Sequence, residues 1–310
     1  MALTLLEAAK LNPGEELRNS IIELYSGSSD ILRTLPFDGI TGNALKYNRE
    51  EKLPGVGFRG VNEPYTESVG VLNPQTESLV IAGGDLDVDK FIVDTMGQDQ
   101  RATHEAMKVR ALSLAWTKKF IKGDADSDPR EFDGIQKRLG TGSQVINAGS
   151  TSGGDALSLL KLDQLIDQVL DPTHLIMNKT MRRLLTQAAR ATNIGGFITW
   201  SIDEFGRQVA SYNGLPILMV DLDEAQNPIL PFTEANPGGG AAASTSIYCV
   251  SFRDGMLTGI QGGLPDVRDL GELQTKPALR TRVEWYNGIA MFNGRCCARL
   301  NGIKNATITA

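Results

Sequence analysis

The sequence predicts an α+β fold, and three patterns in its 310 residues carry this prediction. The stretch from Asp87 to Lys122 contains no proline and only one glycine, Gly97, which favours one long helix. The segment from Leu160 to Ala191 has the order helix, strand, helix. Strand-forming runs separated by turn residues such as Asn213-Gly214 then dominate as far as Phe252. Helices and strands gathered in different parts of a chain are typical of the α+β class.

The predicted helix at Asp87–Lys122 is too long for one small domain. About 36 residues at 1.5 Å each extend roughly 54 Å, against about 30 Å for a small domain. The later half has apolar residues at helical spacing and should pack on a core. These residues are Ala102, Ala106, Val109, Trp116 and Phe120, with Met107, Ala111, Leu114 and Ile121 beside them. The earlier half contains the polar run Gly97–Arg101, so the alternative is two helices broken near Gly97.

The first forty residues predict an arm that lies on another surface. Thr4–Glu7 fits a capping box that opens a short helix, and Leu17–Tyr25 can form a second helical segment. Neither segment has enough apolar area to fold alone.

Residues Thr41–Gly84 predict a long two-stranded loop. Short extended runs, including Gly70–Leu72 and Glu77–Ala82, are broken by turn residues such as Pro54-Gly55 and Asn73-Pro74. A hairpin with so little apolar content is marginal by itself. We therefore expect its tip, with Phe58, Arg59 and Tyr65, to rest on another surface; a mobile surface insertion is the alternative.

The later elements follow from local patterns. We expect an amphipathic helix at Leu160–Leu170, a buried strand at His174–Asn178, a helix at Lys179–Ala191, strands at Phe197–Ile202, Gln208–Tyr212, Leu215–Val220 and Ser246–Phe252, and strand formers over Thr281–Asn293. The glycine-rich run Asn236–Ser244 predicts a flexible, exposed loop.

Composition is that of an ordinary globular protein, with 41% hydrophobic and 22% charged residues. No apolar run approaches the roughly 20 residues of a membrane helix, and the first residues lack the positive start of a signal peptide. The three cysteines lack CxxC spacing, so we interpret Cys296 and Cys297 as reduced core thiols. A net charge of -6 argues against a protein whose task is to grip nucleic acid.

Motifs of catalysis and cofactor binding are missing from the sequence. The run Gly149–Gly154 has no lysine for a phosphate loop. The aspartate runs Asp85–Asp89 and Asp124–Asp128 lack the glycine and glutamate that a calcium loop needs, so we assign the first to a helix N-terminus and the second to a solvated linker. His104 and His174 lack metal-ligand spacing. We predict no catalytic, cofactor-binding or metal-binding residue, and no enzyme.

Three short motifs and their order give a resemblance. They are Glu131-Phe132-Asp133-Gly134-Ile135 after the long helix, Asn213-Gly214-Leu215-Pro216-Ile217-Leu218 in the middle, and Arg282-Val283-Glu284-Trp285-Tyr286-Asn287-Gly288 near the end. With the arm, the extended loop and the long helix, they resemble the major capsid protein of tailed bacteriophages, which has the Hong Kong 97-type fold. The resemblance covers nearly the whole chain.

The resemblance implies a domain organisation. It assigns residues 1–40 to an N-terminal arm, 41–84 to the extended β-hairpin loop, 85–154 to a peripheral domain with the spine helix, 155–275 to the axial domain, and 276–310 to a return strand of the peripheral domain and the C-terminus.

The resemblance also implies a function that lies in interfaces. Such proteins assemble as hexamers and pentamers into an icosahedral shell that encloses double-stranded DNA, without sequence-specific binding, in the virion after assembly in the host cytoplasm. The implied partners are other copies, a portal protein, a separate scaffolding protein, since no long scaffold-like segment precedes Thr41, and a decoration protein as a further candidate; no membrane is involved. Expected inter-subunit contacts are Phe58, Arg59, Glu63, Tyr65, Gln98 and Arg101.

Two further expectations concern the shell. Some family members join subunits through a lysine of the extended loop, but here Lys46 and Lys52 lie near its base and Arg59 at its tip, so we expect a non-covalent shell. The polar run near Gly97 is where we expect the spine helix to bend as the shell matures.

Two alternatives remain open at the level of the sequence. A bacterial nanocompartment shell of the same fold encloses an enzyme, and particle contents distinguish it from a phage head. A homo-oligomeric α/β enzyme is the alternative from another class, and it elutes from gel filtration as a small oligomer.

Overall fold

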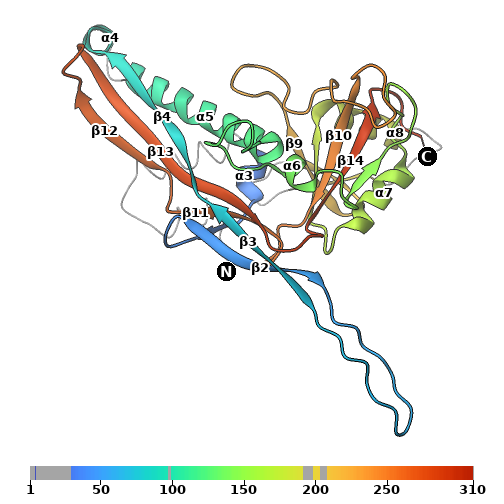
Figure 1. Cartoon of the computed structure of the whole chain (residues 1–310). Helices are drawn as coiled ribbons and strands as arrows, with labels where there is room; N and C mark the ends of the chain where they lie inside the picture. Colours follow the sequence, from blue (N-terminus) through green and yellow to red (C-terminus); the bar gives the residue numbers. More distant parts are fainter. Residues whose placement is uncertain (1–3, 5–28, 97–98, 191–197, 203–207, 310) are drawn as a thin grey trace.

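Two β-sheets and a projecting two-stranded hairpin form the architecture of the protein (Figure 1). The computed structural model describes residues 4, 29–96, 99–190, 198–202 and 208–309. Among the helices of these residues, none has both the length and the apolar character required to cross a membrane.

The five-stranded sheet is organised around one long strand, β13 (Ala278–Met291). The first half of β13 pairs with β12 (Asp266–Glu272) on one side and with β4 (Val80–Asp89) on the other, and its second half pairs with β11 (Leu257–Gln261). A short strand, β1 (Phe37–Gly39), adds to β11 in parallel. Thr281, Val283 and Trp285 of β13 are buried, while the alternate residues carry charges or are exposed.

Helices α4 (Lys90–Met96) and α5 (Asp99–Lys122) replace the single helix predicted over Asp87–Lys122. Its predicted start was wrong, because Asp87 and Asp89 belong to strand β4 and pair with β13. The structure has two helical segments around the Gly97 region, and residues 97–98 lie outside the described part, so the predicted bend there stays a prediction. Val109, Trp116, Phe120 and Ile121 are buried, as expected of the later half.

Within that apolar stripe, Met107 differs from the expectation, because its side chain is largely exposed. Ala102 is exposed as well. The stripe therefore packs on the core only from about Val109 onward.

The seven-stranded sheet has the order β5-β14-β10-β6-β9-β8-β7. Its strands are β5 (Val145–Asn147), β14 (Cys297–Lys304), β10 (Ser244–Val250), β6 (His174–Asn178), β9 (Leu215–Val220), β8 (Gln208–Tyr212) and β7 (Ile198–Ile202). Helices α7 (Leu159–Gln168) and α8 (Lys179–Arg190) pack on one face. On the other face lie α3 (Asp30–Thr34), α6 (Ile135–Leu139) and the end of α5.

Alternation along β6 shows why this sheet is covered on both faces. Leu175 and Met177 face the cluster of α7 and α8, whereas Ile176 faces the cluster that contains α3 and α6. Strands buried on both sides read as continuous apolar runs.

An aromatic cluster joins the five-stranded sheet to α5. The ring centroid of Trp116 lies 5.9 Å from that of Phe37 and 6.0 Å from that of Trp285. Indole Nε1 of Trp116 donates a hydrogen bond to Asn287 Oδ1 at 3.0 Å. The motif around Trp285 therefore contributes to the core of the fold.

Local predictions in the later part of the chain are confirmed. The strand at His174–Asn178 has the expected bounds, and the helices α7 and α8 match within the described residues. Asn213 and Gly214 both have positive φ, 49° and 80°, as a tight hairpin turn between β8 and β9 requires.

Sheet membership differs from the predicted division of the chain. β11 and β12 fall in the range 155–275 assigned to the axial domain, yet they pair with β13 in the five-stranded sheet. β14 falls in 276–310 but pairs with β10 and β5 in the other sheet. Of the predicted return segment 276–310, β13 therefore belongs to the five-stranded sheet, and β14 belongs to the seven-stranded sheet. The predicted helices before residue 29 lie outside the described residues.

Candidate assembly surface

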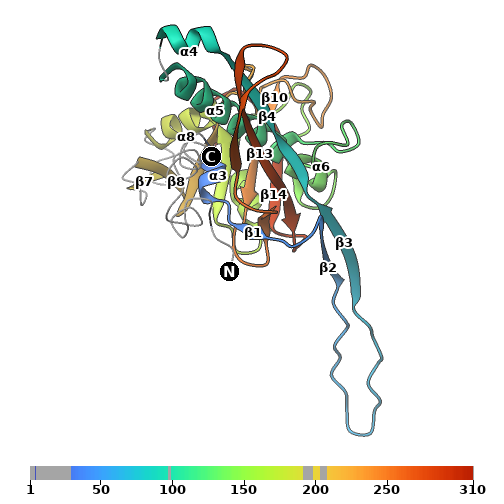
Figure 2. The ribbon, with the colours of Figure 1, turned by 90° about the vertical axis from the view of Figure 1, so that its left-hand side faces the viewer.

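The hairpin of β2 (Ala44–Lys52) and β3 (Val71–Ser78) projects from the body of the protein (Figures 1 and 2). Its strands pair antiparallel, with an irregularity between Glu50 and Lys52. Beyond them, residues 53–70 form the tip, which carries no further strand pairing. The expected long two-stranded loop is therefore present, although Glu77–Ala82 spans the end of β3 and the start of β4 rather than one strand.

The root of the hairpin is held by a partly buried polar cluster. Arg138 of α6 donates hydrogen bonds through both terminal nitrogens to the Glu77 carboxylate, one of them at 2.7 Å. The Tyr47 hydroxyl donates to the carbonyl oxygen of Met291 at 3.0 Å, and its ring lies 4.8 Å from that of Phe292. Burial, and then the Glu77 charge, raise the pKa of Tyr47 to about 12. Both strands of the hairpin are thus tied to the body.

The tip exposes large apolar side chains to solvent. Every residue from 52 to 70 is exposed. The large apolar members are Leu53, Val56, Phe58, Val61, Tyr65 and Val69. Contiguous exposed apolar surface on a protein marks an interaction site. Of these six residues, Phe58 and Tyr65 were predicted from the sequence as contacts. The alternation of apolar and glycine residues in Val56-Gly57-Phe58 is a sequence signal that also indicates Val56.

The four predicted contact residues of the tip lie close together. The Arg59 guanidinium lies 5.0 Å from the centre of the Tyr65 ring and donates to the Glu63 carbonyl oxygen at 3.3 Å. The Glu63 carboxylate accepts a hydrogen bond from the Gly60 amide at 2.9 Å. Phe58 is fully exposed. These contacts stabilise the conformation of the turn, and the exposed Phe58 side chain is available to contact another surface.

The other two predicted contact residues are placed differently. Gln98 lies outside the described residues. Arg101 binds within its own subunit: its guanidinium pairs with Asp269 at 2.8 Å and with Glu105 at 3.1 Å, and donates to the Thr281 hydroxyl at 2.8 Å. These bonds join α5 to the five-stranded sheet within the subunit. A contact of Arg101 with a neighbouring subunit stays a prediction.

The sequence predicts no metal-binding residue, and the positions of the acidic side chains can be compared with that prediction. In the described part of the chain, no cluster of three or more His, Cys, Asp or Glu side chains could hold a metal ion. The run Asp85–Asp89 is in strand β4, not at a helix N-terminus, although Asp89 does accept a hydrogen bond from the Phe91 amide of α4. In the second run, Asp124 and Asp126 bind the Lys137 ammonium group. Lys137 therefore offsets part of the negative charge of this linker.

The cysteines and histidines are the remaining residue types that could catalyse a reaction or bind a metal. All three cysteines are buried and free, and burial raises the pKa of the Cys249 thiol to about 12, so it stays protonated. His104 is exposed on α5, and His174 Nδ1 lies 3.0 Å from the Thr173 hydroxyl. The clearest candidate functional feature is therefore the exposed surface of the hairpin tip.

Comparisons with known proteins agree with this description. The family model of the major capsid protein GP7 matches residues 12–164. No curated protein has a matching sequence. Among solved structures, the SrpI encapsulin from Synechococcus elongatus PCC 7942 is similar over 100% of this chain and 99% of its own, with 14% identity and a TM-score of 0.66.

Two further structures come from phage-like particles. The capsid of a native GTA particle is similar over 89% of this chain and 90% of its own, at 14% identity and a TM-score of 0.61. The Mycobacterium phage Bobi structure is similar over 88% and 89%, at 12% identity and a TM-score of 0.60. These likenesses show the Hong Kong 97-type fold. The family match over residues 12–164 supports a role as a major capsid protein.

Proposed function

We propose that this protein assembles as hexamers and pentamers into the icosahedral head of a tailed phage, enclosing double-stranded DNA, and that it acts through interfaces without catalysing a reaction. The observation that carries the proposal is the hairpin, which has a fixed root and an apolar, uncovered tip. A subunit that presents such a tip lowers its free energy by burying it on a neighbour.

Burial on a neighbouring copy accounts for the composition of the tip. Covering a Val, Leu or Phe side chain contributes about 1.5–3 kcal/mol, and six large apolar residues lie on this loop. Because the root is tied to the body by Glu77 and Tyr47, little backbone freedom remains to be lost there on docking. The tip contacts proposed are Phe58, Arg59, Glu63 and Tyr65.

The remaining partners are part of the same proposal. They are the packaged DNA, a portal protein, a separate scaffolding protein that sets curvature and, as a further candidate, a decoration protein, with assembly in the host cytoplasm. A net charge of -6 supports contact with DNA that is weak over most of the wall, because counterion release is small without a basic face. If the protein expressed alone closes into uniform shells of native size, the separate scaffold is wrong.

The shell is proposed to be non-covalent. Lys46 lies within β2, whereas Lys52 is the last residue of β2 and adjoins the tip; the tip itself carries Arg59 and no lysine. Arginine remains protonated and is not an acylation nucleophile at neutral pH. Boiling purified shells in detergent should therefore release single subunits, and ladders of joined subunits contradict this.

Negative-stain images and gel filtration of the purified protein test the main proposal. We expect capsomers or closed particles whose abundance rises with protein concentration. A small oligomer at every concentration, with no particles, contradicts a shell protein and favours the soluble enzyme.

A nanocompartment shell is the second candidate, because the SrpI encapsulin matches the full length of the chain. The contents of the particles distinguish a nanocompartment from a phage head. In the phage case, particles isolated from the native host should contain DNA of genome length that is protected from nuclease until the particles are opened. Particles that contain an enzyme and no such DNA support the nanocompartment.

A further inference from the structure

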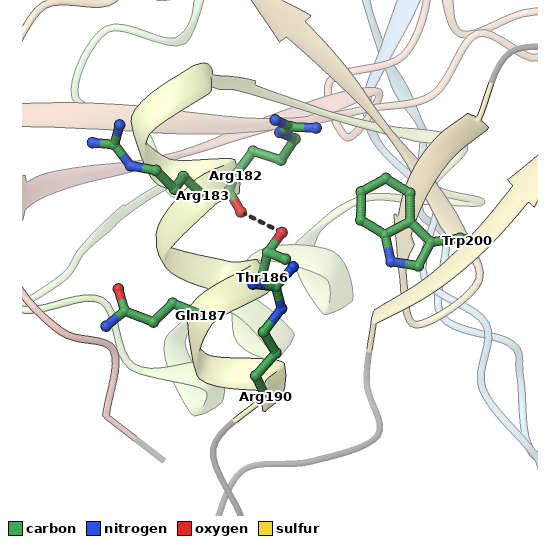
Figure 3. A pocket seen from close by; sticks show the side chains of 6 residues that line it. All are labelled: Arg182, Arg183, Thr186, Gln187, Arg190 and Trp200. Atoms are coloured by element: carbon green, nitrogen blue, oxygen red, sulfur yellow. Dashed lines mark hydrogen bonds between the residues drawn. The ribbon is translucent and has the colours of Figure 1, made fainter.

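A cationic pocket lies between α8 and strand β7, far in sequence from the hairpin (Figure 3). Its volume is about 470 Å³, within the range of small-molecule sites. The lining residues are Arg182, Arg183, Thr186, Gln187, Arg190 and Trp200. Three of these six carry a positive charge and none carries a negative one. Neither the fold nor the proposed shell function requires this composition.

Helical spacing explains how these side chains come together. Arg182, Thr186 and Arg190 are four residues apart and share one face of α8. Figure 3 shows this face turned towards the Trp200 indole, with Arg183 and Gln187 on the other side of the helix. The Thr186 hydroxyl donates to the Arg182 carbonyl oxygen at 3.0 Å, so it still has lone pairs for a ligand. The apolar side of α8, including Met181 and Leu185, is buried in the core and holds the helix in place.

The arginines of the pocket lack counter-charges among the described residues. No ion pair involves Arg182, Arg183 or Arg190 there, whereas Lys179 at the start of α8 pairs with Asp221. Arg182 Nε is also buried without a hydrogen-bond partner in this part of the chain. A buried unsatisfied donor next to unpaired cations costs free energy. A bound anion removes that cost.

Trp200 narrows the chemical class of the anion. Its side chain is about half exposed, at 51% of the residue surface, although it is a large aromatic group. Guanidinium groups bind phosphate oxygens in a bidentate manner, and an indole face stacks on a planar base. A carboxylate partner uses the arginines but leaves the indole without a role. We propose that this pocket binds the phosphate and base of a nucleotide unit, either as a free nucleotide or within a single nucleic-acid strand.

The inference is independent of the shell function and is compatible with it. A nucleotide unit places a negative phosphate and an aromatic plane a few ångströms apart, which matches guanidinium groups of α8 facing an indole of β7. Double-stranded DNA offers phosphates but keeps its bases stacked inside. It should therefore bind more weakly here than a single strand of the same length.

Trp200 itself supplies the measurement. The other two tryptophans, Trp116 and Trp285, are 3% and 1% exposed, so iodide quenching of the full-length protein reports chiefly on Trp200. The probes are ATP, a 12-nucleotide oligothymidine and a 12-base-pair duplex. We expect ATP and the single strand to protect Trp200 from iodide, and the duplex to do so less. Which of the first two binds tighter decides between a free nucleotide and a strand.

Variants link this binding to the pocket. Arg182→Gln/Arg190→Gln should weaken binding of the single strand at least tenfold and reduce its salt slope by about 1.4, as expected for two lost phosphate contacts. Trp200→Leu should weaken binding roughly tenfold through lost stacking, when followed with a fluorescent strand. The matched control, Arg110→Gln/Arg253→Gln, removes two exposed arginines that also lack an ion pair with described residues. It should bind like the original protein.

Three outcomes overturn the proposal. One is that none of the three probes protects Trp200 of the unaltered protein from iodide quenching. Another is that the control variant weakens binding as much as the pocket variant. The last is that Arg182→Gln/Arg190→Gln blocks particle formation while the unaltered protein binds no probe, which identifies the pocket as a protein contact. Particle formation is measured separately, so a failure here leaves the shell proposal intact.

Discussion

Arg138 of α6 holds Glu77 of strand β3 at the root of the hairpin, through two hydrogen bonds between side chains that are each about 15% exposed. The two residues are 61 positions apart in the chain. Because Arg138 also donates to the Ile289 carbonyl oxygen at 3.3 Å, this one side chain joins the hairpin, α6 and strand β13. The direction in which the hairpin leaves the body therefore depends on a partly buried ion pair.

Removal of Glu77 should destabilise the subunit. Glu77→Ala leaves the partly buried Arg138 charge without its partner, and such losses cost up to about 3 kcal/mol. Urea unfolding of the unassembled subunit measures the change. In Glu77→Ala/Arg138→Met both charges are gone, so the double variant should be more stable than Glu77→Ala alone. Equal stability of Glu77→Ala and the unaltered protein refutes the role of this pair.

Changes at the hairpin tip should affect assembly and leave the subunit stable. Val56→Ser/Phe58→Ser alters exposed side chains, so the free energy of unfolding should change by less than about 0.5 kcal/mol. The loss of apolar area at an interface should raise the protein concentration needed for particles at least tenfold. Light scattering against concentration measures this. Glu67→Gln, a change in the same exposed loop, is the control and should assemble normally. Normal assembly of the double variant rules out the tip as a contact.

The pairs between β4 and β13 predict a dependence of stability on acid. Hydrogen bonds from Arg280 lower the pKa of Asp87, and those from Arg282 lower the pKa of Asp85, below the ordinary value of about 3.9. A carboxyl with a lowered folded-state pKa stabilises the fold above its unfolded value, and this contribution is lost as the pH falls towards the folded value.

Melting temperatures of Asp87→Asn between pH 2 and pH 7 test this dependence. The variant should melt below the unaltered protein at pH 7, and the difference should shrink below about pH 4. Both pairs are accessible to solvent, so added salt should reduce the difference as well. A difference that stays constant down to pH 2 contradicts the assignment.

The indole of Trp116 should matter through its hydrogen bond as well as its size. Trp116→Phe leaves the Oδ1 atom of Asn287, which is fully buried, without its donor, and the expected cost is about 1–3 kcal/mol. Denaturant unfolding of four proteins, with and without Asn287→Ala, isolates the hydrogen-bond contribution. The substitution should cost less in the Asn287→Ala background. The same cost in both backgrounds means that only packing is lost.

The sequence by itself determined the elements whose signals are local. The strand at His174–Asn178, the helices α7 and α8, and the turn at Asn213-Gly214 follow from periodicity and from backbone preferences within a few residues. The order of such elements was also enough for the resemblance to a capsid protein. The hairpin and its exposed tip were predictable in kind, because turn residues and few apolar residues mark a loop that packs poorly.

Only the tertiary structure decided what depends on distant partners. Asp87 carries no local sign of a strand, since its partner Arg280 is 193 residues away, and the acidic run therefore resembled a helix start. The bonds of Arg101 within the subunit, to Thr281, which is 180 residues away, and to Asp269, likewise have no local signal in the sequence. The α8 arginines and Trp200 line one pocket only because the sheet places β7 beside α8, which no local pattern predicts. Periodicity states which side of an element is apolar, whereas the identity of the partner is set by the packing of the whole chain.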